Sequence, residues 1–197
     1  VEWMDAHNKV ADDNDPYAIR LKKVFGNHTS EAGLTLNFKV YLVTDINAFA
    51  CADGSVRVFS SLMDILTDNE LLAVIGHEIG HVKNEDTKDA IKAAYTRAAF
   101  KDAAASQSGA ARTLSESELG EFAEGFLGAS HSRKQESDAD SYSYAFLKNN
   151  KYSVVGAYTA FKKLALLSGG DTQTKSQKMM SSHPDSESRA AEVKARA

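Results

Sequence analysis

The sequence predicts an α+β fold: one mostly helical domain over residues 1–197, with a single small antiparallel sheet ahead of its central helix. Helix start signals and apolar residues three or four positions apart recur through most of the chain. The alternation typical of strands is confined to residues 36–59. A length of 197 residues, 43% of them hydrophobic, is enough for one domain with its own core.

The first part of the chain predicts two helices followed by the sheet. Residues 2–14 have a helical composition, and Asp15 followed by Pro16 predicts a second helix that runs to about residue 29. The sheet is predicted from strands and a hairpin turn in the order strand 36–44, strand 47–51, turn 52–55 and strand 56–59.

The central helix is predicted to follow a short helix at residues 60–66 and to begin at a capping box formed by Thr67 and Glu70. Gly76 and Gly80 lie inside this helix, where each costs about 1 kcal/mol relative to Ala. That cost predicts that another backbone comes close on the glycine side. Apolar residues recur at helical spacing and predict a half-buried helix: Leu72, Ile75, Ile79 and Val82.

Further helices are predicted after the central one. Ser115 with Glu118 forms a second capping box, and Ser132 is a third start signal. The segment from Ser106 to Thr113 is small and polar without a period, so we expect a mobile loop that is open to proteolytic nicking. The remaining predicted helices cover about residues 86–105, 132–149, 154–168 and 186–196.

Composition excludes several classes of protein. A net charge of −4 and a pI near 5.9 provide no electrostatic basis for binding nucleic acid. No run of 18 apolar residues exists, so no transmembrane segment is predicted in this chain. The single cysteine, Cys51, excludes an internal disulfide and lies in a predicted strand, where a packed hydrophobe is favoured over a reactive thiol.

The central helix carries the motif His77-Glu78-Ile79-Gly80-His81. At 3.6 residues per turn His77 and His81 leave the same face one turn apart, so both can hold one metal ion. Glu78 lies about 100° around the helix, where its carboxylate can reach a water on that ion. This arrangement is typical of zinc hydrolases, and it is favoured over two solvated histidines on a surface helix.

Two imidazoles leave a catalytic zinc ion one protein ligand short. The metzincin class is excluded because neither the Gly nor the His that it requires follows His81. Glu136, near the start of a later helix, is the preferred third ligand, and Asp140 one turn on can orient a ligand histidine. A carboxylate in the first turn of a helix is also favoured by the helix dipole. That effect would explain one of the two carboxylates but not the spacing of four residues between Glu136 and Asp140. Glu85, four residues after His81, is the competing candidate.

These motifs resemble the gluzincin pattern, and specifically the CAAX-prenyl-endopeptidase and HtpX-like metalloendopeptidases. The resemblance covers most of the chain from about residue 38. It implies a zincin-like fold, a Zn²⁺ cofactor and hydrolysis of peptide bonds in a polypeptide substrate. It rests on His77-Glu78-Ile79-Gly80-His81, on Glu136-Ser137-Asp138-Ala139-Asp140, on residues 47–50 and 56–62, and on His183-Pro184 with Arg189.

Carried over residue by residue, the resemblance implies that His77, His81 and Glu136 hold Zn²⁺. Glu78 would act as the general base, and Asp140 would support a ligand histidine. The polypeptide substrate would pair with the edge of the small sheet through main-chain bonds to Asn47, Ala48 and Ala50.

The resemblance also brings His183 and Arg189 into the expected site. Pro184 predicts the start of the final helix, so His183 stands on a rigid corner. Two roles for His183 stay open: it donates to the oxyanion, or it occupies the open zinc position in the resting enzyme. Arg189 is expected to face the same cleft and add positive charge for the oxyanion.

The predicted function is therefore a zinc-dependent endopeptidase of unfolded or misfolded proteins in bacterial envelope quality control. The chain looks like the soluble branch of its family, so we expect a periplasmic location and a lipid anchor upstream of residue 1. The alternative is a zinc-containing peptide-binding or chaperone-like protein with little proteolysis, against which an intact Glu78 argues. A non-peptidase metallohydrolase is a further alternative that only a substrate assay would separate.

Overall fold

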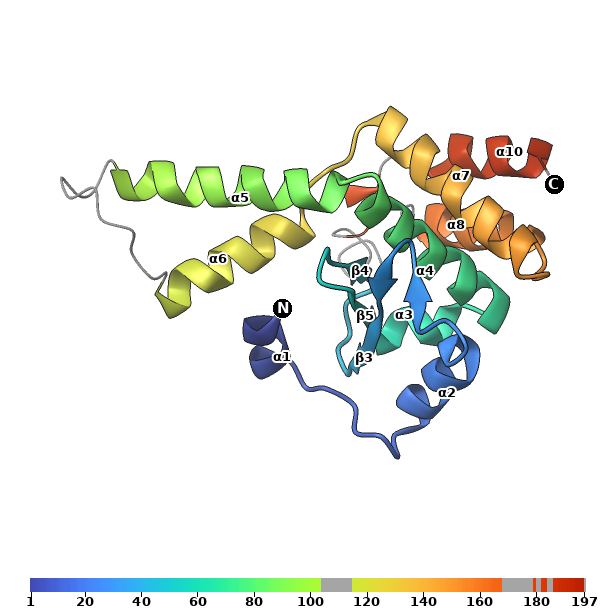
Figure 1. The fold of residues 1–197 in the computed structure, drawn as a ribbon, viewed down its shortest axis with the longest axis horizontal. Helices are drawn as coiled ribbons and strands as arrows, with labels where there is room; N and C mark the ends of the chain where they lie inside the picture. The colour runs from blue at the N-terminus through green and yellow to red at the C-terminus, as the bar shows by residue number, and fades with distance from the viewer. Residues whose placement is uncertain (104–114, 168–178, 180–181, 184–185, 197) are drawn as a thin grey trace.

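The computed structural model describes residues 1–103, 115–167, 179, 182–183 and 186–196. The predicted loop at residues 106–113 and Pro184 lie outside them. Mostly helical with short strands, the described chain confirms the α+β class (Figure 1). The helices are α1 Glu2–His7, α2 Pro16–Phe25, α3 Ser60–Ile65, α4 Asp68–Lys83, α5 Asp86–Ala103, α6 Glu116–Leu127, α7 Arg133–Asn149, α8 Val155–Leu167 and α10 Ser186–Arg196. The strands are β1 Ser30–Glu31, β2 Leu34–Thr35, β3 Asn37–Tyr41, β4 Ala48–Ala50 and β5 Ser55–Phe59.

Side chains at the predicted start positions do cap the helices. At the start of α4 the Thr67 hydroxyl accepts a hydrogen bond from the Glu70 amide, and the Glu70 carboxylate accepts one from the Thr67 amide at 2.8 Å. The same reciprocal pair begins α6 at Ser115 and α7 at Ser132, and Asp15 caps α2. Because each cap is complete within one turn, the sequence alone was enough to predict these starts.

The main sheet is mixed, so the prediction of an antiparallel sheet was wrong. Its strand order is β3-β5-β4, with β5 antiparallel to β4 but parallel to β3. All residues of β5 are buried, and this strand takes the central place between its two neighbours. Alternation predicts that a segment is a strand but not which neighbour it pairs with. The second helix also ends earlier than predicted, at Phe25, and the short antiparallel pair β1–β2 follows it.

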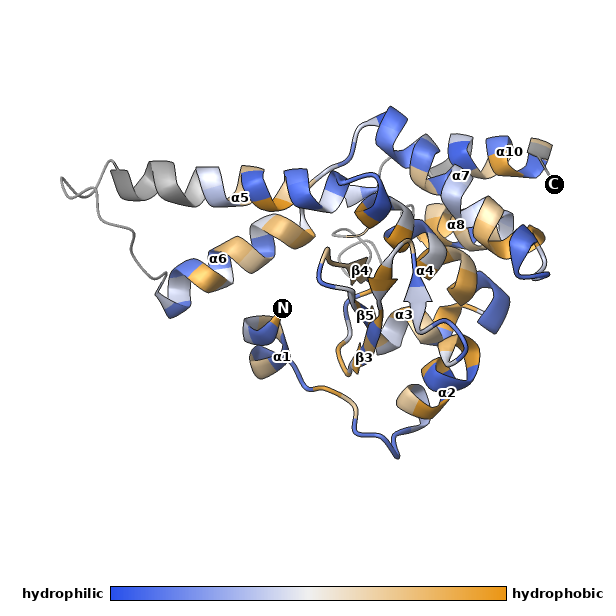
Figure 2. Ribbon diagram, viewed as in Figure 1, coloured by the Kyte–Doolittle hydropathy of each residue, from blue (hydrophilic) through white to orange (hydrophobic). Residues whose placement is uncertain are grey.

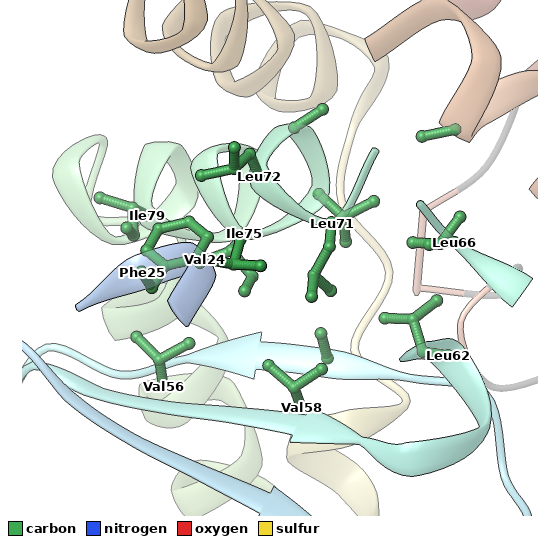
Figure 3. Packing of buried hydrophobic residues seen from close by; sticks show 14 of the residues in the cluster. Val24, Phe25, Val56, Val58, Leu62, Leu66, Leu71, Leu72, Ile75 and Ile79 are labelled. Atoms are coloured by element: carbon green, nitrogen blue, oxygen red, sulfur yellow. The ribbon is translucent and has the colours of Figure 1, made fainter. Parts of the chain in front are cut away.

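Helix α4 packs across the sheet and forms the centre of the core. Hydrophobic residues gather where α4 meets the strands (Figure 2), and Leu71, Ile75 and Ile79 lie on the side of α4 that faces β5, α3 and α2 (Figure 3). Every residue from Glu70 to Val82 is buried, so α4 is more buried than the predicted half. The reason is that α7 and α8 cover the side that carries the histidines. The labelled core residues in Figure 3 are Val24, Phe25, Val56, Val58, Leu62, Leu66, Leu71, Leu72, Ile75 and Ile79.

The two glycines of α4 let α7 approach closely. This confirms the prediction, made from the cost of glycine inside a helix, that another backbone lies close on the glycine side. A Cβ atom added at Gly80 would lie 3.0 Å from the Ala139 Cα and 3.1 Å from the Ala139 carbonyl oxygen. A Cβ atom added at Gly76 would lie 3.1 Å from the ring of Phe146 and 3.5 Å from Ser143. This close contact brings the start of α7 against the histidine motif on α4.

We therefore expect Gly80→Ala to lower the free energy of unfolding by about 1 kcal/mol. The overpacking of about 1–3 kcal/mol against the backbone of Ala139 exceeds the gain in helix propensity of about 1 kcal/mol. The matched control is Gly125→Ala in α6, where no heavy atom lies within 4 Å and the same gain should stabilise the protein. Urea denaturation measures both, and equal stabilisation by the two variants would contradict the close packing of α4 on α7.

A buried ion pair ties α1 to the sheet. Asp5 accepts hydrogen bonds from Arg57 Nε at 2.8 Å, Lys39 Nζ at 2.7 Å and Tyr41 Oη at 2.7 Å. Burial raises the pKa of Asp5, but these three bonds outweigh it and hold that pKa well below its usual range. Arg57 is 2% exposed, so its guanidinium depends on Asp5 as a partner.

Helices α5 and α6 form a hairpin that projects from the body (Figure 1). The hairpin begins directly after α4, and the end of α6 returns to the sheet, where the rings of Phe126 and Phe49 lie 5.8 Å apart. Trp3 of α1 donates a 2.7 Å hydrogen bond to Glu116 at the start of α6. In the described parts of the chain, no helix combines the length and apolar character needed to cross a membrane.

Candidate active site

The histidine motif places two imidazoles on one face of α4. The Nε2 atoms of His77 and His81 lie 3.0 Å apart, and the two residues are 2% and 1% exposed. Burial, then the charges of Arg189 and His81, lowers the pKa of His77 to about 3. His77 is therefore neutral at physiological pH, the form of imidazole that binds a metal.

Helix α7 brings Glu136 to the same point. Ser132 begins α7 so that Glu136 lies in its first turn, and the Glu136 carboxylate lies 3.3 Å from His81 Nε2. Burial raises the pKa of Glu136, but hydrogen bonds with His183 and His81 hold it well below its usual range. The competing candidate Glu85 is exposed and pairs with Lys88 at 3.1 Å, so of the two candidates Glu136 is the one that lies beside the histidines.

His183 closes the cluster from just before α10. Its Nδ1 atom lies 3.3 Å from His77 Nε2 and 3.0 Å from the Glu136 carboxylate. A backbone hydrogen bond fixes the residue before His183: the His131 amide donates to the Ser182 carbonyl at 3.1 Å. His183 therefore lies beside the expected ligands, and not in solvent.

The spacing of these donors fits zinc. A tetrahedral Zn²⁺ with bonds of about 2.0 Å to nitrogen and oxygen holds neighbouring ligand atoms about 3.3 Å apart. The donor atoms of His77, His81, Glu136 and His183 lie at distances of 3.0–3.5 Å from one another in the five pairs with a recorded contact. Nitrogen and carboxylate donors are also the set that zinc prefers.

The charges around the cluster also favour a cation. Glu78, Asp86, Glu136 and Asp140 are buried carboxylates, and Arg189 is the permanent cation that the described residues place among them. A divalent ion would offset the remaining negative charge. The cluster therefore fits Zn²⁺ in both geometry and charge.

Asp140 lies against His77, where the sequence analysis expected a carboxylate that orients a ligand histidine. Its carboxylate lies 2.8 Å from His77 Nδ1, one turn after Glu136 on α7. Burial raises the pKa of Asp140, but hydrogen bonds with Arg189 and His77 bring it down to about 2. An ionised Asp140 fixes the His77 tautomer with Nε2 free for the metal.

Arg189 does not line the cleft that holds Glu78, and direct oxyanion stabilisation by its guanidinium stays a prediction. The guanidinium forms two hydrogen bonds with Asp140, at 2.7 and 2.8 Å, and an ion pair with Glu136. It also lies 4.5 Å from the Phe161 ring. The guanidinium also lies 3.3 Å from His77 Nε2, so Arg189 sits beside the expected ligands, where it holds the two carboxylates of α7 in position.

Sequence reasoning missed the groups that hold His81. Asp86 accepts from His81 Nδ1 at 2.9 Å and is itself held by the Gln135 amide at 2.9 Å. The ring of His131 stacks on His81 with 3.9 Å between centroids. The sequence does show an acidic residue, Asp86, five positions after His81. It does not show the geometry of the turn after α4, which directs the Asp86 side chain towards His81.

We expect Asp86→Asn and Asp140→Asn each to weaken zinc binding by roughly 10- to 100-fold, because each removes the carboxylate that orients a ligand histidine. Competition with a chromophoric zinc chelator measures the affinity. Asp138→Asn is the matched control, since Asp138 lies on α7 but is exposed and pairs with Lys134. Wild-type zinc affinity in Asp86→Asn would show that Asp86 does not position His81.

Glu78 stands apart from the ligands in the way a general base requires. Its Oε1 atom is buried and has no hydrogen-bond partner in the described residues, and the nearest recorded side-chain nitrogen is His183 Nε2 at 3.5 Å. Burial is the main cause that raises the pKa of Glu78 above its usual range. A carboxylate held without a structural hydrogen bond on that oxygen is available for chemistry.

A cleft runs from Glu78 and His81 to the outer edge of β4. The carbonyl of Asn47 accepts from the Phe59 amide at 3.0 Å inside the sheet, so the alternation of antiparallel pairing turns the backbone groups of Ala48 and Ala50 outward. The Asn47 side chain accepts from the Ala48 amide at 2.9 Å. Since Thr87 also approaches the Ala50 carbonyl at 3.5 Å, the Ala48 carbonyl and the Ala50 amide are the outward main-chain groups that remain for a substrate.

A histidine motif on a buried helix, a glutamate from a later helix and a buried carboxylate beside them define a zinc metalloprotease. Comparison with known proteins agrees. Residues 19–197 match Peptidase family M48, and the chain belongs to this family.

The chain is similar to two curated proteins over almost its whole length. Metalloprotease YcaL of Escherichia coli (strain K12) is 43% identical over 196 residues, which cover 98% of this chain and 75% of that protein. Metalloprotease LoiP of the same strain is 41% identical over 196 residues, which again cover 98% of this chain and 75% of that protein. A protease HtpX homolog of Tropheryma whipplei (strain Twist) is 36% identical over 91 residues, which cover 43% of this chain and 30% of that protein.

Proposed function

We propose that this zinc metalloprotease is an endopeptidase that cleaves extended segments of unfolded or misfolded polypeptides. The observation that carries the proposal is the position of Glu78, buried and without a hydrogen-bond partner on Oε1, in the same cleft as the outward backbone groups of β4. A strand edge binds an extended chain through main-chain bonds and tolerates many sequences. Such tolerance suits the clearance of misfolded proteins.

The chain's own residues divide the chemistry among them. His77, His81 and Glu136 would hold the ion, which supplies Lewis-acid chemistry for attack of water on the scissile carbonyl. Glu78 takes the proton from the attacking water and passes it to the leaving amine. Ala48 and Ala50 align the extended substrate so that its carbonyl lies over the cluster.

We further propose that His183 shuts the resting enzyme. A catalytic zinc site keeps one position open, whereas a closed set of four protein donors is typical of structural zinc. His183 Nδ1 completes such a closed set here, at 3.0 Å from the Glu136 carboxylate. This closed set is the feature that would favour the non-proteolytic alternative, but a structural site leaves Glu78 without a role.

We expect His183→Ala to raise the rate of casein cleavage. If the closed form outweighs the open form by about ten to one, removal of the imidazole should raise the rate by about tenfold. An oxyanion donor predicts instead a loss of ~10² to 10³ in rate. Zinc content, measured on the same samples, should stay at one ion held by the other three ligands, and a loss of rate at full zinc content would overturn the proposed closure.

The decisive experiment for the function is zinc stoichiometry together with casein cleavage, with and without a chelator, on the wild type and His183→Ala. Chelator-sensitive cleavage by either protein supports the endopeptidase. Binding of unfolded casein without cleavage by both proteins at full zinc content would favour the peptide-binding alternative.

We also propose a place in the bacterial periplasm, tethered to the outer membrane by a lipid anchor. The support is the resemblance of residues 38–197 to the soluble envelope branch of the family. Fractionation of cells that express the complete gene product tests this, since recovery only in the cytoplasmic fraction would contradict it.

A further inference from the structure

We infer that the base of the α5–α6 hairpin forms a subsite for a small apolar side chain of the substrate next to the scissile bond, and that Phe126 sets its depth. This inference rests on the proposed endopeptidase and adds its substrate preference. The hairpin is thus part of the specificity apparatus, and not only an extension of the fold.

The first support is the place of the hairpin residues. Ala90 of α5, Phe126 and Leu127 of α6 and Ala129 just after α6 line the same cleft as Glu78. Each of the four apolar side chains is only partly buried. Apolar side chains that stay partly exposed beside a general base are typical of a binding pocket.

The second support is that this wall is anchored. The Phe126 ring packs edge-on against Phe49 of β4, with 5.8 Å between centroids and 86° between planes. Thr87, at the start of α5, approaches the carbonyl of Ala50 at 3.5 Å. The hairpin base is therefore joined to the strand that would carry the substrate backbone, so a side chain on that backbone would meet the wall at a defined distance.

The third support is the polarity and size of the space. The polar lining groups are Glu78, three imidazoles, Asn47, Thr87 and Ser182, and among the described residues that line the cleft there is no lysine or arginine. The wall that the hairpin supplies is apolar apart from Thr87, so a substrate side chain that meets Phe126 and Ala90 gains most if it is apolar. The cavity measures about 30 Å³, room for about two water molecules. A side chain of the size of Ala or Val fits this space better than Leu or Phe.

The test is a set of quenched fluorescent peptides that carry Ala, Val, Leu, Phe, Lys or Glu at each of the two positions flanking the scissile bond. We expect the wild type to prefer Ala or Val at one of these positions by at least about tenfold in kcat/KM, since each extra methylene at a fixed wall is worth about that factor. Phe126→Ala deepens the space and should shift the preference at that position to Leu or Phe by about tenfold.

Phe122→Ala is the matched control, because Phe122 lies one turn earlier on α6 and does not line the cleft. It should keep the wild-type profile, while circular dichroism confirms that both variants fold. If Phe126→Ala keeps the wild-type profile at both positions, or Phe122→Ala shifts it equally, the subsite assignment is wrong.

Where turnover of the wild type is low, all variants are compared within the His183→Ala background, because His183 also lines the cleft and its removal changes the space in every arm alike. If peptides and casein alike remain intact in that background at full zinc content, the proposed function fails and the inference fails with it. Cleavage with an unaltered profile overturns the subsite alone.

Discussion

Glu78→Gln should lower the rate of casein cleavage by at least ~10²-fold, the usual contribution of a general base, while zinc stays bound. The amide has the same shape but accepts no proton from the attacking water. Glu78 is not one of the residues that meet around the metal position, so the ligand cluster should remain intact. Single-turnover cleavage assays together with metal analysis measure both quantities on the same sample.

Gln135→Asn is the control for this prediction. It is a conservative change near the ligand cluster, and it leaves Glu78 in place. It shortens the side chain that holds Asp86 and should affect zinc affinity more than the chemical step. Near wild-type cleavage by Glu78→Gln would refute the role of Glu78 and with it the proposed mechanism. Loss of zinc from Glu78→Gln would instead make Glu78 a ligand.

Glu136→Ala should lose both zinc and proteolysis. Glu136 is 1% exposed, and its carboxylate lies between His81 and His183, so removal of this expected oxygen ligand would leave the ion with imidazoles alone. We expect the zinc content to fall from one ion per chain to near zero after dialysis, and cleavage to fall to background. Inductively coupled plasma mass spectrometry and the casein assay measure these results.

Glu85→Ala is the matched control for this prediction. Glu85 lies four residues after His81 but is exposed, with its side chain paired to Lys88. Zinc and activity should be unchanged in this variant. Zinc loss in Glu85→Ala but not in Glu136→Ala would mean that the turn after α4 rearranges when the metal binds and that the third ligand is wrong.

Local signals account for the part of the structure that the sequence predicted. The capping boxes at Thr67, Ser115 and Ser132 are complete within four residues, and the structure has helices starting at all three. The spacing of His77 and His81 follows from the helical repeat alone. The cost of Gly80 inside a helix also indicated a close neighbour, although not that Ala139 would be that neighbour.

Where prediction failed, the outcome depended on elements far apart in the chain. The alternation of β3 predicts a strand, but the pairing of β3 parallel to β5 depends on β5 being the more buried strand. Arg189 carries a charge that the sequence placed in the cleft, whereas the packing of α10, mainly against α8, turns it towards Asp140 on α7.

The sequence by itself therefore determined the chemistry of this protein: two imidazoles and a carboxylate on one helix, with Glu136 and Asp140 one turn apart on another. Only the tertiary structure decided how these groups meet, with His183 at the fourth corner, Asp86 behind His81 and a hairpin wall over the cleft. The physical reason is the distance along the chain over which each interaction acts. Helix periodicity and capping act within a turn or two, whereas the meeting of α4, α7 and the segment before α10 depends on burial and close packing between distant segments.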